Sequence, residues 1–373
     1  MTKKCDAADS KQVYSVFDYL AMEELPSYES IFSLTQKVCE LLEGEAFYKK
    51  SYRPLNCMNE GGSLLELYKE NQRQLPAIIV PDIHARPNFI LNILNYELPK
   101  KFCGCREDGK KYKVYQALQK KLIDLICVGD GVHTELYAAR WELIALEFAK
   151  GEHTGFYMKQ EMILNLATFC ALLKLKADFP QNFHFLKGNH ENILNCNFGG
   201  DYSFYKYADE GEMFKQFMLA QYDEKLVNLI AKYENLLPLV AAGKNYVVSH
   251  AEPAASFTRE QIIDARFDEE VVAGLIWTKN GQVKEPTAAE IMKNLLGKKN
   301  AKKALYFAGH RPVKENYALR QNGDFVQLHN PRKQNVALIY KDKKFNLEKD
   351  IVNTKPEIYG KADKEGRSGG KEK

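Results

Sequence analysis

The sequence predicts an α/β fold with a metal site at one edge of its sheet. Five short apolar runs have the composition of buried strands, and residues of metal-binding type follow each run directly. The runs are AIIVP (77–81), LIDLICV (122–128), FHFLK (183–187), NYVV (245–248) and ALYFA (304–308). Open α/β sheets bind ligands in the crevice at the carboxyl ends of their strands. We therefore expect the side chains that follow the five runs to meet in one crevice.

Histidine is concentrated in the five segments that follow these runs. The segments read DIH (82–84), GDGVH (129–133), GNHE (188–191), SHAE (249–252) and GHRP (309–312). They contain five of the eight histidines of the chain. Each motif alone is a weak signal, but the five in this pattern and order indicate a metal site.

The types of ligand narrow the choice of metal. A mixture of Asp, Asn and His suits divalent ions such as Mn, Fe, Zn or Mg, and differs from a thiolate site. The candidate metal ligands are Asp82, His84, Asp130, Asn189, His250 and His310. Six ligands on five separate strand ends predict two divalent metal ions rather than one.

Composition argues against several other classes of protein. The chain has 373 residues, 45% of them hydrophobic, which allows one large core or two modest ones. Its 53 basic and 49 acidic residues are nearly balanced, so no nucleic-acid partner is predicted. No apolar run has the length of a membrane span, and the N-terminus lacks the apolar stretch of a signal peptide. The eight cysteines show no framework spacing. We predict a cytoplasmic protein without a membrane partner; its oligomeric state stays open.

The chain is predicted to have three parts. Residues 1–75 form an N-terminal helical extension, because VYSVFDYLAMEEL and IFSLTQKVCELL have helical spacing and Pro26-Ser27 separates them. We favour an extension packed on the catalytic domain over a separate partner-binding module. Residues 76–345 form the catalytic domain. Residues 346–373 form a charged tail that we expect to be disordered, because most of it is almost free of apolar residues.

Two insertions interrupt the catalytic part. One is lysine-rich, KKFCGCREDGKKYKVYQALQKK (100–121), and the other reads WELIALEFAKGEHTGFYMKQ (141–160). Each follows a strand-end motif, so each is a candidate for the rim of the site. A lysine-rich rim would attract phosphorylated substrates. The alternative is an ordinary solvated face, which the sequence favours slightly.

The motifs resemble the signature blocks of the calcineurin-like metallophosphoesterases. Within these, residues 170–192, CALLKLKADFPQNFHFLKGNHEN, are similar to the phosphoprotein phosphatase family of serine/threonine phosphatases. The blocks NLLPLVAAGKNYVVSHAEPA, GLIWTKNG and FVQLHNPRKQNVALIY follow in the same order as in that family. The resemblance covers residues 76–342. It implies a metallophosphoesterase fold, in which helices flank a central β-sandwich of mixed sheets, and a metal-dependent phosphatase activity.

The resemblance also implies a role for each ligand. Asp82, His84 and Asp130 would hold the first metal ion, and Asp130 would bridge to the second ion, which Asn189, His250 and His310 complete. A hydroxide activated by the metals would then attack the phosphate ester. His190 would be the general acid that protonates the leaving group, for which the imidazole pKa is suitable. Glu191 is expected to support the loop through hydrogen bonds.

The second motif departs from the family pattern, which reads GD-x-x-DRG. His133 replaces the Asp that orients the acid histidine, and Thr134 replaces an Arg that grips phosphate. We expect His133 still to orient His190 or to contact phosphate. Arg86, Arg311 and Lys187 are the nearest candidates for a rebuilt phosphate-binding site, because a guanidinium fork or an ammonium suits that anion.

Three functions agree with this pattern. The first is hydrolysis of phosphoserine or phosphothreonine in proteins, which the resemblance favours. The second is hydrolysis of a small molecule such as a dinucleoside polyphosphate, which the missing arginines make plausible. The third is a non-catalytic relative that binds phosphate or a partner. All six ligand positions are retained, which argues against this third function.

Overall fold

The computed structural model describes residues 14–48, 51–68, 74–104, 111–283 and 286–356. Three predicted segments lie partly outside the described residues. They are the helical extension (residues 1–13, 49–50 and 69–73), the lysine-rich insertion (residues 105–110) and the tail (residues 357–373). Among the described residues, no helix is both long and apolar enough to cross a membrane.

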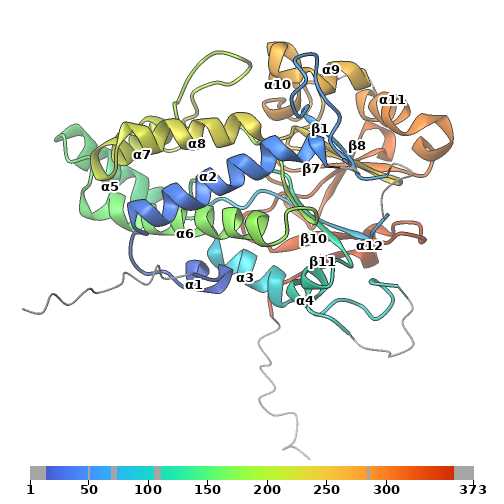
Figure 1. Ribbon diagram of the computed structural model, residues 1–373, viewed down its shortest axis with the longest axis horizontal. Helices are drawn as coiled ribbons and strands as arrows, with labels where there is room; N and C mark the ends of the chain where they lie inside the picture. Colours follow the sequence, from blue (N-terminus) through green and yellow to red (C-terminus); the bar gives the residue numbers. More distant parts are fainter. Residues whose placement is uncertain (1–13, 49–50, 69–73, 105–110, 284–285, 357–373) are drawn as a thin grey trace, which may run out of the picture.

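Two mixed sheets form the centre of the molecule (Figure 1). The five-stranded sheet has the order β11 (Ile351–Asn353), β10 (Asn335–Ile339), β2 (Ala77–Val80), β3 (Asp124–Cys127) and β4 (Phe183–Phe185). The six-stranded sheet has the order β1 (Leu64–Glu66), β5 (Val240–Gly243), β6 (Tyr246–Ser249), β7 (Leu305–Ala308), β9 (Phe325–Gln327) and β8 (Ala318–Arg320). The five strands predicted from apolar runs are therefore confirmed as β2, β3, β4, β6 and β7.

Parallel pairing brings the strand ends of each sheet together. In the first sheet, β2 pairs in parallel with β3, and β3 with β4. In the second sheet, β6 pairs in parallel with β7, and β7 with β9. The carboxyl ends of parallel neighbours lie at the same edge of a sheet, so the segments after these strands meet there.

Alternating side chains along each strand separate two apolar layers. In β2, Ile78 belongs to the core beneath the helices, whereas Ile79 belongs to the layer between the sheets. In β7, Phe307 lies between the sheets and Tyr306 faces the helices on the far side. This period of two is the geometry of a strand buried on both faces. The predicted sandwich of mixed sheets flanked by helices is confirmed.

Helices cover both outer faces of the sandwich (Figure 1). On the first sheet the core includes residues of α1 (Val16–Leu20), α2 (Tyr28–Gly44), α3 (Pro87–Asn95), α4 (Val114–Gln119), α5 (Ala138–Ala149), α6 (Phe156–Asp178), α7 (Glu210–Gln221) and α8 (Glu224–Leu236). On the second sheet it includes residues of α9 (Arg259–Ile263), α10 (Glu269–Ile276) and α11 (Thr287–Ala301).

The two ends of the chain contribute to these layers. Helices α1 and α2, predicted from their spacing, begin after the N-cap residues Ser15 and Ser27 and pack against α6 and α8. Strand β1 extends the second sheet by pairing with β5. The start of the predicted disordered tail is ordered, which corrects that expectation: α12 (Leu347–Asp350) leads into β11, whose Ile351 is buried. The division at residues 75 and 345 stays a prediction.

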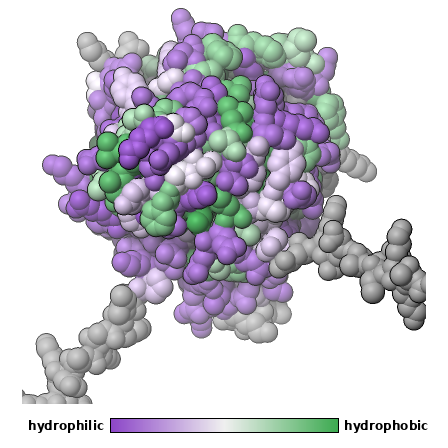
Figure 2. Space-filling model, turned by 90° about the vertical axis from the view of Figure 1, so that its left-hand side faces the viewer, coloured by the Kyte–Doolittle hydropathy of each residue, from purple (hydrophilic) through white to green (hydrophobic). Residues whose placement is uncertain are grey.

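The two insertions occupy different places. The described part of the lysine-rich insertion lines a hollow with Leu75 and Pro76, which precede β2. This is the edge opposite the strand ends that hold the motifs, so these described residues of the insertion lie away from the rim, in agreement with the slightly favoured alternative of a solvated face. The other insertion forms α5 and the start of α6. It exposes Leu146 and Phe156. Helix α5 lies at the left-hand end of the molecule in Figure 1, and this end faces the viewer in Figure 2, where apolar side chains gather among hydrophilic ones.

Candidate metal centre

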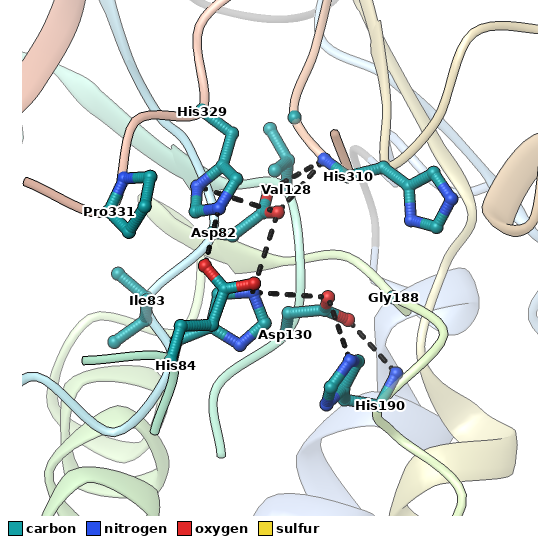
Figure 3. A network of polar contacts seen from close by, with 12 residues as sticks. Asp82, Ile83, His84, Val128, Asp130, Gly188, His190, His310, His329 and Pro331 are labelled. Atoms are coloured by element: carbon teal, nitrogen blue, oxygen red, sulfur yellow. Dashed lines mark hydrogen bonds and ion pairs between the residues drawn. The ribbon is translucent and has the colours of Figure 1, made fainter. Parts of the chain in front are cut away.

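The predicted ligands converge where the strand ends of the two sheets meet. Asp82, His84 and Asp130 come from segments after β2 and β3, and Figure 3 shows them pointing toward one another. The Nε2 atom of His84 lies 3.7 Å from Asp82 Oδ2 and 3.6 Å from Asp130 Oδ2. Asn189, His250 and His310 complete the cluster from segments after β4, β6 and β7. All six predicted ligands therefore lie in one cluster, because each follows a strand whose carboxyl end reaches this edge.

The backbone of the site is held in an uncommon conformation. His84, Asp130, His133 and His310 all have positive φ angles, of 46°, 51°, 67° and 63°. Left-handed backbone at a non-glycine residue costs about 1–3 kcal/mol and is frequent at functional sites. Gly309 is required by close packing, because a Cβ atom there would overlap Asp82 Oδ1.

The carboxylates of the cluster are deeply buried. Asp82 accepts hydrogen bonds from the backbone N–H of His310 at both oxygens, at 3.0 and 2.9 Å. Asp130 Oδ1 accepts from the backbone N–H of His190 at 2.9 Å, which leaves Oδ2 toward the cluster. Burial raises the pKa of Asp130 well above its usual range, and the nearby Asp82 and Glu191 add to this. Two buried carboxylates this close call for positive charge between them.

The orientation of the His84 ring indicates where a positive charge can lie. Its Nδ1 lies 3.1 Å from the carbonyl oxygen of His133 and donates to it, so Nε2 faces the carboxylates. Burial lowers the pKa of His84, but Glu135, Asp82 and Asp130 outweigh it and raise this pKa to about 9. The surroundings of Nε2 thus favour a cation.

A second group of donor atoms surrounds Asn189. His250 Nδ1 donates to the carbonyl of Val128 at 3.1 Å, so its Nε2 bears a lone pair when the ring is neutral. That Nε2 lies 2.9 Å from Asn189 Oδ1 and 3.2 Å from His310 Nδ1, which is itself 2.9 Å from the same oxygen. Burial lowers the pKa of His250 to about 4. Asn189 Oδ1, His250 Nε2 and His310 Nδ1 share at most one proton when both rings are neutral. Such a set of acceptor atoms fits a divalent ion well.

His190 stands beside these groups without being one of the six ligands. Its ring stacks on Phe204 with 4.1 Å between centroids, and its Nε2 lies 3.8 Å from Asp130 Oδ2. Its Nδ1 lies 3.2 Å from the Nδ1 of His133. Burial, with His84 and His133 nearby, lowers the pKa of His190 well below the usual value. His133 therefore faces the residue that it was predicted to orient.

Buried polar groups hold the two motif loops in place. Glu191 accepts hydrogen bonds from the backbone N–H groups of Asp130, Gly131 and Gly188 at 2.9, 2.8 and 2.7 Å, which confirms its predicted supporting role. Asn165 of α6 accepts from the backbone N–H of His133 at 2.5 Å. In the same helix, Glu161 accepts hydrogen bonds from both the N–H and the hydroxyl of Thr134, so α6 supports the loop.

The three candidates for phosphate binding have different surroundings. Arg86 donates to backbone carbonyls, among them those of Asp82 at 2.6 Å and Pro331 at 3.1 Å. Its guanidinium therefore links the segment after β2 to the loop that contains Pro331. Lys187 lies 3.1 Å from Asp201 and lines a hollow of about 360 Å³ with it. Arg311 Nε is buried and has no hydrogen-bond partner among the described residues. These contacts favour Arg311 over Arg86 and Lys187.

Two residues at the cluster were not predicted as ligands. His329 follows β9 and lies 3.6 Å from Asp82, through its Nδ1 and Oδ2. Glu135 lies 2.8 Å from His329 and 3.6 Å from His84. His329 follows an apolar strand as the predicted histidines do, so the same pattern, a histidine after an apolar run, could have identified it. Nothing in the sequence marked Glu135 beyond its place in the second motif.

Comparison with known proteins places the chain in a family. Residues 75–340 match the family described as calcineurin-like phosphoesterase, so the chain belongs to the calcineurin-like phosphoesterases. Family and site together define a metal-dependent phosphatase. None of the curated proteins matches the chain.

Solved structures are similar to the chain at low sequence identity. One is a protein serine/threonine phosphatase from Saccharomyces cerevisiae with similarity to human phosphatase PP5. It is 16% identical with a TM-score of 0.52, and the match covers 88% of this chain and 89% of that one. Another is a cold-active protein-tyrosine phosphatase of a psychrophile, Shewanella sp., at 12% identity and a TM-score of 0.40, covering 71% and 75%.

Proposed function

We propose that this chain hydrolyses phosphoserine and phosphothreonine in proteins, with two divalent metal ions at the candidate metal centre. The observation that supports this most strongly is the convergence of all six predicted ligands, with His190 beside them. Asp82, His84 and Asp130 would hold the first ion, and Asp130, Asn189, His250 and His310 the second. When bound, such a pair activates water as a nucleophile and neutralises the charge of the phosphoryl oxygens.

The protein supplies the proton and the positioning. We assign His190 as the acid that protonates the leaving alkoxide, since an imidazole at the edge of the cluster suits proton transfer. Of the two Nδ1 atoms of His133 and His190, one donates to the other, so the tautomer of His190 is linked to that of His133. Phe204 covers the face of the His190 ring. Arg311 is assigned to the phosphate oxygens because its buried Nε has no other partner among the described residues.

The surroundings of the site favour a protein substrate. The loop after GNHE exposes Tyr202 and Tyr205, at 47% and 78% of their surface. Tyr202 stands against Trp277, whose ring lies 6.5 Å from that of His310. Aromatic side chains at the rim of an open site provide contact area for a peptide chain.

A dinucleoside polyphosphate is the second candidate substrate. The same pair of rings, Tyr202 and Trp277, offers a stacking surface for a nucleobase. In addition, Thr134 stands where a phosphate-binding Arg is expected, and its side chain is bonded to Glu161.

A substrate panel tests the proposal. Metal-reconstituted protein is assayed with phosphoserine and phosphothreonine peptides, with diadenosine tetraphosphate and with p-nitrophenyl phosphate. We expect the peptides to give the highest kcat/KM of the natural esters. Preference for the dinucleotide would replace the proposed substrate with the second one. No turnover of any ester with Mn, Fe, Zn or Mg would contradict the proposed activity itself.

A further inference from the structure

His329 lies in the metal-binding cluster, although it belongs to none of the five motifs. It follows β9, and its side chain is fully buried. Its ring lies 5.2 Å from the ring of His84 between centroids, and Figure 3 shows it close to Asp82 and His84. The backbone there is fixed, because the carbonyl of His329 accepts a hydrogen bond from the N–H of Val313 at 2.8 Å. The position of the His329 side chain beside Asp82 and His84 is therefore fixed by the fold.

Glu135 determines which ring nitrogen of His329 carries the proton. Its Oε2 lies 2.8 Å from His329 Nε2, and a carboxylate only accepts hydrogen bonds, so Nε2 is the donor. With Nε2 donating to Glu135, a neutral His329 ring has its lone pair on Nδ1.

The Nδ1 atom of His329 points to a carboxylate and not to a donor. It lies 3.6 Å from Asp82 Oδ2 and has no hydrogen-bond partner among the described residues. A buried acceptor without a donor is costly, and facing a carboxylate makes it more so. A cation between the two atoms removes this cost.

The distances fit one shared ion. Donor atoms of Asp82, His84 and His329 all lie within 4.8 Å of one another. Oxygen and nitrogen ligands lie about 2.0–2.2 Å from a metal such as zinc, so two ligands of one ion are at most about 4.4 Å apart. The separations of Asp82 Oδ2 from His84 Nε2 and His329 Nδ1 are 3.7 and 3.6 Å, which is inside that limit.

We propose that His329 is a further ligand of the first metal ion, and that Glu135 is a positioning residue that orients it. The proposal rests on the two-metal function proposed above and extends it. The first site then holds two imidazoles, His84 and His329, beside the carboxylates of Asp82 and Asp130. A carboxylate that fixes a metal-binding imidazole through its second nitrogen is a common arrangement in metalloproteins.

The additional imidazole changes which metal the first site selects. Nitrogen ligands suit Zn, Fe and Co, whereas Mg prefers oxygen ligands and water. With two imidazoles, the first site should bind Zn²⁺ or Co²⁺ much more tightly than Mg²⁺.

Cobalt binding tests the proposal without reference to activity. The full chain is freed of metal with a chelator and titrated with Co²⁺. Metal per chain and the visible absorption of Co²⁺ are both recorded. The variants are His329→Ala and Glu135→Gln, and the control is His184→Gln, which removes a buried imidazole of β4 outside the cluster.

The expected result is two ions per unaltered chain. In His329→Ala, one ion should bind at least 10–100-fold more weakly, and the absorption band of that ion should change. Glu135→Gln should weaken the same ion by about 10–100-fold, and His184→Gln should leave both ions unchanged.

Two results would overturn the proposal, and they are distinguishable. If His329→Ala binds both ions with unchanged affinity and absorption, His329 only positions Asp82, and the two-metal function stands. If the unaltered chain binds no Co²⁺, the two-metal function and this proposal both fail. If circular dichroism shows that His329→Ala does not fold, Glu135→Gln decides, and unchanged binding of both ions in it overturns the proposal.

Discussion

The Nδ1 atoms of His133 and His190 face each other at 3.2 Å, where a carboxylate–imidazole pair is expected from the family pattern. A carboxylate would stabilise the protonated form of the acid, whereas a second imidazole does not. Burial, followed by the charge of His84, also lowers the pKa of His133 well below its usual value. This pair makes His190 harder to protonate.

His133→Asp should therefore shift the pH–rate profile for alkyl phosphates. The protonated form of His190 exists below its pKa, so activity is lost as pH rises through that value. A carboxylate at position 133 raises this pKa and should move the alkaline limb to higher pH. The profile is measured at constant metal content. An unmoved limb would show that His133 does not act on His190.

His190→Ala should discriminate between leaving groups. If His190 protonates the leaving oxygen, kcat should fall by about 10²–10⁴-fold on an alkyl phosphate. The loss should be much smaller on p-nitrophenyl phosphate, whose leaving group needs little protonation. Equal losses on both esters would assign His190 to positioning instead.

Asp130→Asn should abolish activity and lower the metal content. The amide oxygen retains the hydrogen bond that Oδ1 accepts from His190, but an amide cannot bridge two cations as a carboxylate does. Metal per chain is measured by atomic emission. Asp201→Asn is the matched control, because Asp201 is also buried but pairs with Lys187 outside the cluster. Two metals and normal turnover in Asp130→Asn would contradict the bridging role.

Arg311→Ala and Arg86→Ala should have different effects. Arg311→Ala should raise KM about 10–100-fold, the effect of losing charged hydrogen bonds to phosphate, without lowering Tm. Arg86→Ala should lower Tm and metal affinity, because its guanidinium holds the backbone of Asp82 to that of Pro331. Steady-state kinetics and thermal unfolding of both variants measure this. An unchanged KM in Arg311→Ala would remove Arg311 from the phosphate site.

A buried ion cluster outside the candidate metal centre should contribute to the pH dependence of stability in acid. Glu45 pairs with Arg53 at 2.9 Å and with Lys176, and all three are buried. Burial raises the pKa of Glu45, but Lys176 and Arg53 outweigh it and lower the pKa from 4.5 to about 2. The stabilisation is therefore complete above about pH 4.5, and it is lost as pH falls toward 2.

Glu45→Gln tests that cluster. Breaking a buried pair costs about 3–5 kcal/mol, so the free energy of unfolding at pH 7 should drop by roughly this amount. The deficit relative to the unaltered chain should shrink as pH falls below 4.5. Glu97→Gln, in an exposed pair with Lys111, is the control and should change little. Equal unfolding energies for both variants would contradict the role of Glu45.

The sequence by itself determined the strands and six of the residues that meet after them. Apolar runs of four to seven residues have the length of a buried strand, and a ligand placed directly after such a run is carried to the strand end. This local rule explains why Asp82 and His250, far apart in the chain, were both predicted for one crevice. It also placed His190 and the supporting Glu191, because both lie within a motif.

Only the tertiary structure decided which other side chains share that crevice. His329 follows β9 and Glu135 lies in the loop after β3, and only the packing of the two sheets brings them within 2.8 Å. Tertiary packing also decided where Arg86 and the lysine-rich insertion lie relative to the site. Whether an Arg or Lys side chain contacts phosphate, a backbone carbonyl or solvent depends on where its loop lies relative to the sheet. Local sequence does not specify that, because long-range packing sets it.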